Sequence, residues 1–131
     1  MSSLLEDKDA IRDLLSKYCF HTDSGEADAL VALFVENCLY DGGPFGRFED
    51  RAALHGFIAG AAARYSSVRH LTMNEVILVA GETARSRSYF LVLNCASNPP
   101  APIFAGTYED EFVKAGGRWL FKSRIVKPAQ K

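Results

Sequence analysis

The order of the expected elements constrains the fold of this chain more than any other feature. Helical patterns fill the first half, and four long strand-like segments fill the second half, over 68–79, 83–94, 103–114 and 118–127. Ala80-Gly81-Glu82 and Ala115-Gly116-Gly117 separate two pairs of these segments and are typical of tight hairpin turns. Helices followed by an antiparallel meander predict an α+β fold, with the helices packed on one face of the sheet.

The first half predicts three helices and one short strand. In the first helix, apolar residues recur at i, i+3, i+4 and i+7 from Ile11, which marks one buried face. Gly25 suits the turn that ends this helix, and Asp50 suits the N-cap of the third. The expected helices span 6–22, 26–34 and 51–64, and the expected strand spans 37–41.

Length and charge bound the class of protein. A chain of 131 residues is long enough for one domain with a core and too short for two, so we expect a single domain over 1–131. The formal net charge of −1, with no basic run, gives no electrostatic case for nucleic acid or an anionic membrane as a partner. The polar N-terminus lacks a signal-peptide pattern, and a cytoplasmic location is therefore the expectation.

Motifs for common cofactors are missing from the sequence. Cys19, Cys38 and Cys95 are far apart with no C-x-x-C spacing, which favours free thiols in a reducing compartment. The three histidines lack metal-ligand spacing, and neither a G-x-G-x-x-G run nor a P-loop occurs. We therefore expect no metal and no cofactor.

Neither face of the expected sheet is cleanly polar. In the segment 83–94, Arg85, Arg87 and Tyr89 alternate with Ser86, Ser88 and Phe90, so apolar side chains occur on both faces. A sheet of this kind usually packs against helices on one side and a partner on the other. The pattern predicts a homodimer formed through the sheet.

Three residues are the main candidates for chemistry. Asp23 follows the first helix, His70 lies early in a long strand, and Arg124 lies near the C-terminus. A carboxylate can orient an imidazole as a base, and an arginine can hold a developing anion. Each residue also has a simpler interpretation. Asp23 is then a carboxylate in a turn, His70 a strand histidine with a structural hydrogen bond, and Arg124 a solvated charge on a strand. Strict alternation places Arg124 with Lys122, so a pocket position requires a β-bulge.

Several runs of this sequence together resemble a known family. These runs are 11–18, 23–25, 30–34, 69–74, 106–110 and 117–124. They are similar to the SnoaL-like branch of the NTF2-like superfamily, and the similarity extends over about 8–127. The resemblance implies a cone-shaped α+β barrel with a deep apolar cavity, in which N-terminal helices pack on a strongly curved, mostly antiparallel sheet.

The resemblance also implies a site. In the branch with scytalone dehydratase, bile-acid 7α-dehydratase and hexachlorocyclohexane dehydrochlorinase, a His–Asp dyad abstracts a proton. His70 and Asp23 occupy the matching places, which favours His70 as the base and Asp23 as its orienting group. Tyr18 matches a tyrosine five residues before the aspartate, Tyr40 matches one in the first strand, and Arg124 matches an arginine for the leaving group.

These matches predict a cofactor-independent lyase, of the dehydratase or dehydrohalogenase type, acting on a small apolar, cyclic molecule. Asn94 lies where a further family carboxylate is expected and has no acidic proton to give. A ketosteroid-isomerase-like or polyketide-cyclase-like enzyme is one alternative, although Gly42 stands where that isomerase has its aspartate base. A non-catalytic binding or accessory subunit, such as a dioxygenase small subunit, is another. The expected cavity residues are Tyr40, Phe57, Phe90, Asn94, Phe104 and Trp119.

Overall fold

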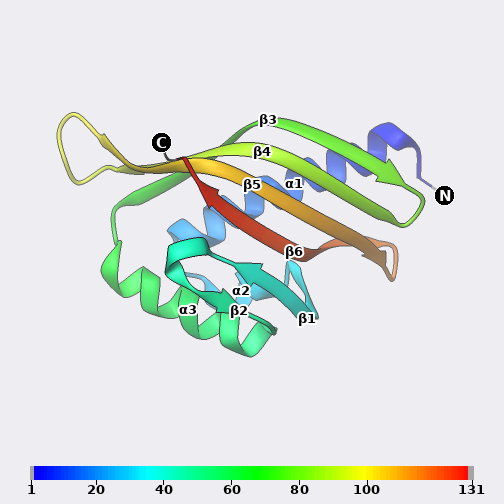
Figure 1. The fold of residues 1–131 in the computed structure, drawn as a ribbon, viewed down its shortest axis with the longest axis horizontal. Helices are drawn as coiled ribbons and strands as arrows, with labels where there is room; N and C mark the ends of the chain where they lie inside the picture. The colour runs from blue at the N-terminus through cyan, green and yellow to red at the C-terminus, as the bar shows by residue number, and fades with distance from the viewer. Residues whose placement is uncertain (1, 130–131) are drawn as a thin grey trace.

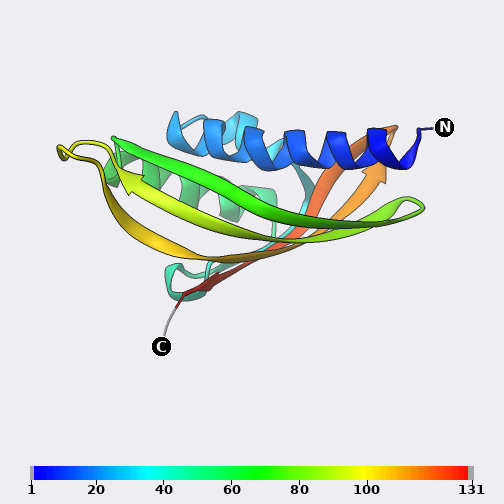
Figure 2. The same cartoon turned by 90° about the horizontal axis from the view of Figure 1, so that it is seen from above.

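A six-stranded sheet curves under the first helix in the computed structural model, which describes residues 2–129 (Figure 1). Figure 2 shows helices α1 and α3 on the same side of this sheet. The helices are α1 (Leu4–Asp23), α2 (Ala27–Val31), the 3-10 turn η1 (Gly43–Phe45) and α3 (Arg51–Arg64). The strands are β1 (Phe34–Asp41), β2 (Arg47–Phe48), β3 (Val68–Ala80), β4 (Thr83–Asn94), β5 (Ala101–Ala115) and β6 (Arg118–Pro128).

The sheet is mixed and does not close into a barrel. Its strand order is β2-β1-β6-β5-β4-β3, so β2 and β3 are the two edges. Only the β1–β6 pair is parallel, and every other pair is antiparallel. The prediction of an α+β fold with helices on a mostly antiparallel sheet is confirmed. The described residues contain no helix that is both long and apolar enough to cross a membrane.

The predicted second helix is wrong at its C-terminal end. It ends at Val31, and Phe34 already begins β1, three residues before the predicted strand. Phe34 is completely buried and stacks on Phe121 of β6, with the ring centroids 4.7 Å apart. This tertiary contact draws the chain into the sheet, because burying an aromatic ring outweighs a few tenths of a kcal/mol of helix propensity.

A β-bulge in β6 decides which of its side chains face the helices. Phe112 of β5 pairs with Phe121, whereas the preceding Glu111 pairs with Ser123, so Lys122 is an extra residue. The bulge shifts the alternation by one residue. As a result Phe121 and Arg124 are both fully buried while Lys122 is exposed. The bulge that a pocket position of Arg124 requires is therefore present.

The N-terminal end of α1 is held to the sheet by a polar cluster. The Asp7 carboxylate accepts hydrogen bonds from Trp119 Nε1 at 3.0 Å and from Ser2 Oγ at 2.5 Å, and Lys114 Nζ lies 3.4 Å away. The hydrogen bonds from Ser2 and Trp119 lower the pKa of Asp7. Asp7, which Trp119 contacts, lies about 24 Å from Asp23 along α1, at a rise of about 1.5 Å per residue. The structure does not bring Trp119 to the cavity described below.

Gly106 of β5 lies so close to the backbone of β6 that it leaves no room for a side chain. A Cβ atom on Gly106 would clash with the Lys127 carbonyl oxygen and would lie 2.7 Å from Phe90 Cε2. Gly60 in α3 has no neighbouring atom within 4 Å of such a Cβ. The two glycines therefore offer a matched pair for substitution by alanine.

Gly106→Ala should lower the free energy of unfolding by about 1–3 kcal/mol, because backbone must move to make room. Gly60→Ala should raise it by about 0.5–1 kcal/mol, because alanine is the better helix former. Urea unfolding of both variants measures the difference. A Gly106→Ala variant as stable as the unsubstituted protein would show that β5 and β6 do not approach so closely.

Candidate functional site

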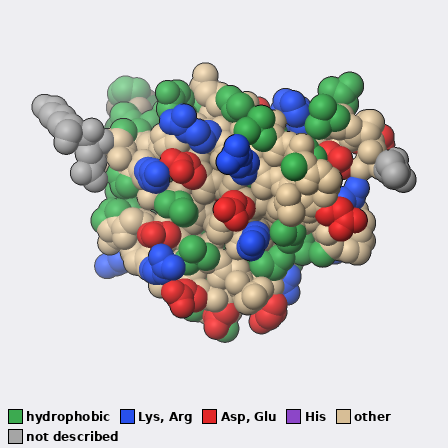
Figure 3. Space-filling model, turned by 45° about the vertical axis from the view of Figure 1, so that its right-hand side comes forward, with side chains coloured by type: hydrophobic (Ala, Val, Ile, Leu, Met, Phe, Trp, Pro, Cys, Tyr) green, Lys and Arg blue, Asp and Glu red, His purple; other side chains and the backbone are tan. Residues whose placement is uncertain are grey.

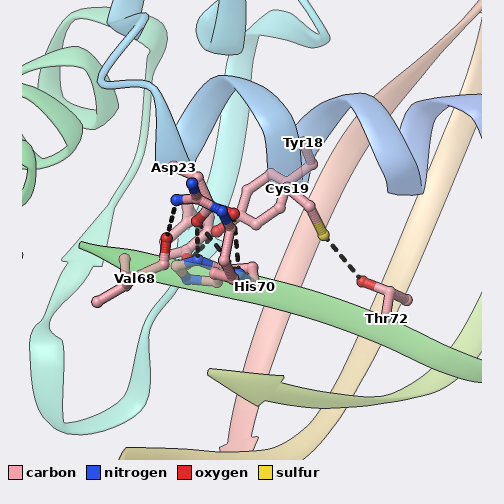
Figure 4. A network of polar contacts seen from close by, with 8 residues as sticks. Tyr18, Cys19, Asp23, Val68, His70 and Thr72 are labelled. Carbon is pink, nitrogen blue, oxygen red and sulfur yellow. Dashed lines mark hydrogen bonds and ion pairs between the residues drawn. The ribbon is translucent and has the colours of Figure 1, made fainter. Parts of the chain in front are cut away.

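The last residue of α1 and the third residue of β3 form a close polar pair. Asp23 Oδ1 lies 2.6 Å from His70 Nδ1, and the same carboxylate accepts the backbone N–H of His70, with Oδ2 at 2.9 Å (Figure 4). Only 10% of the Asp23 side chain and 17% of the His70 side chain are exposed. The carboxylate thus holds both the strand backbone and the imidazole ring, and the structure brings the two predicted residues together.

The contact to Asp23 selects the tautomer of His70. An ionised carboxylate can only accept hydrogen bonds, so Nδ1 of the neutral ring carries the proton. Nε2 then carries the lone pair, and no described residue makes a hydrogen bond to it. Because His70 lines the cavity, this nitrogen is available to take a proton from a bound molecule.

Two buried tyrosines stand beside the dyad. The hydroxyl oxygens of Tyr18 in α1 and Tyr40 in β1 are 2.8 Å apart, and the two side chains are almost fully buried. The Tyr18 ring meets the His70 ring edge-on, with the centroids 6.4 Å apart. Burial raises the pKa of both tyrosines, so both hydroxyls stay protonated near neutral pH and act as hydrogen-bond donors.

Arg124 lies beneath the tyrosines and not in the cavity. It is completely buried, and its Nε and Nη2 donate to the two carboxylate oxygens of Asp110 at 2.8 and 2.9 Å. The guanidinium carbon lies 3.6 Å from the ring centroid of Tyr108 and 4.2 Å from that of Tyr18. The resemblance implies that Arg124 contacts a leaving group, but the structure places it behind the cavity wall.

The pair also sets the ionisation of Asp110. Burial raises the pKa of its carboxyl, and the adjacent Arg124 guanidinium acts in the opposite direction. Both carboxylate oxygens are used by Arg124, and the Ser86 side chain is buried at the paired position on β4. The pair is thus a hydrogen-bonded ion pair enclosed by aromatic rings.

A cavity of about 350 Å³ opens between α3 and the sheet. Gly56 and Gly60, one helical turn apart in α3, lie on its wall and leave it wide there. Its polar groups include His70, Tyr18 and Tyr40, and most of its wall is apolar. Of the residues expected to line it, those that do are Tyr40, Phe57, Phe90 and Phe104.

The structure does not bring Asn94 to this cavity. Asn94 ends β4, and its side-chain oxygen accepts the backbone N–H of Ala96 at 3.0 Å in the turn that follows. This bond directs the amide toward its own loop. Asn94 and Trp119 are both absent from the cavity wall.

Sequence reasoning missed Tyr108 and Asp110 as individual site residues. Both side chains are buried on the helix-covered face of the sheet, and Tyr108 lines the cavity. The period of two along β5 places Gly106, Tyr108, Asp110 and Phe112 on one face. An acidic residue in the middle of that buried face was the available signal, because it requires a buried partner.

No group of three or more His, Cys, Asp and Glu side chains placed to hold a metal ion occurs among residues 2–129. The expectation that the protein works without metal or cofactor remains a prediction.

Comparison with known proteins places the chain in a family. The sequence profile described as a SnoaL-like domain matches residues 3–125. No curated protein matches the sequence. An NTF2-like protein with a cystatin-like fold from Novosphingobium aromaticivorans is similar at 28% identity and a TM-score of 0.88, with 94% of this chain and 82% of that chain covered.

Two further solved structures are similar. One is a candidate scytalone dehydratase from Novosphingobium aromaticivorans, at 28% identity and a TM-score of 0.84, covering 96% of this chain and 86% of that chain. The other is a protein of unknown function with a cystatin-like fold from Nostoc punctiforme, at 19% identity and a TM-score of 0.90, covering 100% and 97%. The last likeness supports the fold alone.

Removing one member of the buried ion pair should be strongly destabilising. Arg124→Met leaves Asp110 buried without its partner, and we expect a loss of about 3–5 kcal/mol in the free energy of unfolding. The double variant Arg124→Met, Asp110→Leu should recover much of that loss. Denaturant unfolding measures both values.

A neighbouring exposed ion pair serves as the control. Lys127 Nζ lies 2.8 Å from Glu109 Oε2 on the same two strands, and both side chains are well exposed. Lys127→Met should change the stability by at most about 1 kcal/mol. An equally small effect of Arg124→Met would contradict the structural role assigned to the buried pair.

Proposed function

We propose that this chain, which belongs to the SnoaL-like domain family, is a cofactor-independent lyase acting on a small, apolar, cyclic substrate. Some members of this family are dehydratases or cyclases. The observation that carries the proposal is the 2.6 Å contact between Asp23 and His70, which leaves the second imidazole nitrogen free at a mostly apolar cavity. The likeness to a candidate scytalone dehydratase at 28% identity supports the same reaction class.

In the proposed reaction, His70 Nε2 removes a proton from a carbon next to a carbonyl group. The C–H electron pair moves toward the carbonyl oxygen and forms an enolate. Asp23 stabilises the imidazolium that results, and a hydroxyl of the Tyr18–Tyr40 pair donates to the enolate oxygen. Apolar walls keep water away, which strengthens these interactions.

The second half of the reaction expels the leaving group from the neighbouring carbon. The enolate electrons return to form a carbon–carbon double bond, and the leaving group departs with its bonding pair. Since neither Arg124 nor Asn94 lines the cavity, we assign proton return to a leaving hydroxide to the His70 imidazolium. Water and an unsaturated ketone are then the products, and the imidazole returns to its neutral state.

The isomerase alternative lacks its carboxylate in this cavity. Gly42 occupies the position aligned with the isomerase base, and the neighbouring Asp41 accepts the Gly43 backbone N–H at 3.0 Å. Asp41 is not part of the cavity wall. These positions favour His70 as the single base and elimination as the reaction.

His70→Ala should abolish turnover, and Asp23→Asn should lower kcat by at least about 100-fold, because general-base catalysis contributes at least that much. The assay follows cyclic β-hydroxy ketones and β-halo ketones by mass spectrometry for the loss of water or hydrogen halide. Melting temperatures of the variants show whether the fold is intact.

A second His–Asp pair in the same chain provides the control. His55 Nε2 lies 2.7 Å from Asp28 Oδ1, but both side chains are well exposed and outside the cavity wall. His55→Ala should leave turnover unchanged. Full activity of a folded His70→Ala variant would refute the mechanism, and a product of unchanged mass would indicate an isomerase.

We also propose that two copies of the chain associate through the outer face of the sheet. Val76, Leu78 and Tyr89 are 62%, 53% and 56% exposed there, and all three line a hollow of about 730 Å³. Arg85 pairs across β4 and β5 with Glu111, so basic and acidic residues lie side by side on this face. Figure 3 shows charged side chains interspersed with hydrophobic ones in an oblique view of the molecule. A second copy would offer both apolar surface and opposite charges.

Leu78→Asp should convert the proposed dimer into a monomer, because a charge replaces an apolar side chain at the centre of the contact. Sedimentation velocity measures the mass in solution. Leu5→Asp should leave the dimer intact, since Leu5 lies on α1 away from the sheet face and is 77% exposed, more than Leu78. A monomeric unsubstituted protein would refute the association.

A further inference from the structure

The cavity opens to solvent on one side, and a charged residue lies at this opening. Phe45 of η1, Tyr65 at the end of α3 and Ile103 of β5 line the cavity and are exposed, so they form the rim of the opening. Arg64, in the last turn of α3, lines the same cavity and is also exposed. It is the only Asp, Glu, Lys or Arg residue on the cavity wall that residues 2–129 form.

The residues around the opening leave the charge of Arg64 unopposed. Arg64 makes no ion pair with a carboxylate of the described part of the chain, whereas several other arginines do. The segments around the rim, 42–46, 56–65 and 91–105, contain no Asp or Glu. The local charge at the opening is therefore positive, although the whole chain has a formal net charge of −1. A local positive field of this kind attracts anions.

An anionic group has a favourable place at this opening and an unfavourable one deeper in the cavity. The inner wall is mostly apolar, and a charge buried there would lose its hydration. The Asp23 carboxylate behind His70 would also repel it. At the rim an anion keeps part of its hydration and meets the Arg64 guanidinium. A bound molecule with one charged end is thereby oriented, with its neutral part toward His70 and its charge toward solvent.

We infer that Arg64 is a specificity-determining residue that selects substrates with a carboxylate at the end remote from the reacting carbon. The inference rests on the function proposed above and adds the charge of the substrate, which is then a cyclic ketone with a carboxylate on the opposite edge of the ring system. The Arg64 guanidinium pairs with this carboxylate at the opening. The cavity of about 350 Å³ receives the rings, and this volume is in the range of roughly 300–1,000 Å³ that is usual for small-molecule sites.

Two probes of the same shape and different charge test the inference. The first is 6-carboxy-1-tetralone, which is an anion near neutral pH, and the second is its primary amide, which is neutral and has the same rings and ketone. Isothermal titration calorimetry measures the Kd of each probe for the unsubstituted protein, for Arg64→Gln and for Arg64→Lys. The glutamine removes the positive charge, and the lysine keeps it.

The unsubstituted protein should bind the carboxylate about fivefold more tightly than the amide at low salt, as expected for a partly exposed ion pair. Arg64→Gln should remove this preference, and Arg64→Lys should keep most of it. About 1 M NaCl should also remove it, because salt screens exposed charges. Arg118→Gln is the control and should keep the preference, since Arg118 is an exposed arginine at the start of β6 and outside the cavity wall.

A purely structural role of Arg64 would give a different result. A cation in the last turn of a helix interacts favourably with the C-terminal end of the helix dipole, so Arg64→Gln should also lower the melting temperature slightly. A structural role alone leaves the ratio of the two Kd values unchanged, because the ratio compares two ligands in the same folded protein. The ratio therefore separates selection of the ligand from support of α3.

Three results would overturn the inference: no preference for the carboxylate in the unsubstituted protein, a preference that persists in folded Arg64→Gln, or no binding of either probe. His70→Ala should keep the charge preference, because it leaves the Arg64 guanidinium in place. Turnover of neutral ketones by a protein without any charge preference would leave the lyase and end the inference. A charge preference without turnover of any ketone would leave an anion-selective binding site without the proposed catalysis.

Discussion

The buried ion pair between Arg124 and Asp110 is the interaction on which the interior depends. Two charges removed from water are stable only with good geometry, and this pair has two bonds at 2.8 and 2.9 Å, while Arg124 Nη1 has no partner among the described residues. Aromatic rings complete the enclosure, since the guanidinium lies over Tyr108 and Tyr18. The pair therefore joins β5 and β6 and also fixes two rings of the cavity wall. Its position in turn depends on the β6 bulge, which places Arg124 inward.

A second constraint acts at the other wall of the cavity. Asp23 ends α1, and its carboxylate bonds to both the backbone and the ring of His70 in β3. A helix end and an edge strand are thereby held in one relative position. The base is placed by a rigid helix and strand and not by a loop, which favours a well-defined geometry. The ion pair supports the tyrosines and the carboxylate supports the histidine, so each wall is held by a charged group that does not itself line the cavity.

Much of the fold could be predicted from periodicity, since the α+β order, the hairpin turns and the first and third helices follow local rules. The error at the second helix has a tertiary cause. Phe34 joins the sheet because Phe121, far along the chain, provides a stacking surface. Among the site residues, Tyr18, Asp23, Tyr40 and His70 were found mainly through the resemblance, and their side chains do meet in the structure. Trp119 was misplaced because alternation cannot say at which end of a long strand a cavity opens. Asn94 lies at the cavity end of β4, opposite Val68, but its amide is bonded to the loop that follows the strand.

By itself, the sequence determined the class of fold, the alternation of side chains along β4, and the residue types available for acid–base chemistry. These properties depend on spacing along the chain, and spacing is what a sequence contains. Only the tertiary structure decided that Arg124 supports the cavity from behind and that Tyr108 faces into it. The position of Arg124 depends on a one-residue bulge in β6, because a single extra residue reverses every inward and outward assignment beyond it. The position of the Tyr108 ring depends on Phe90 and Arg124, which pack against it from neighbouring strands.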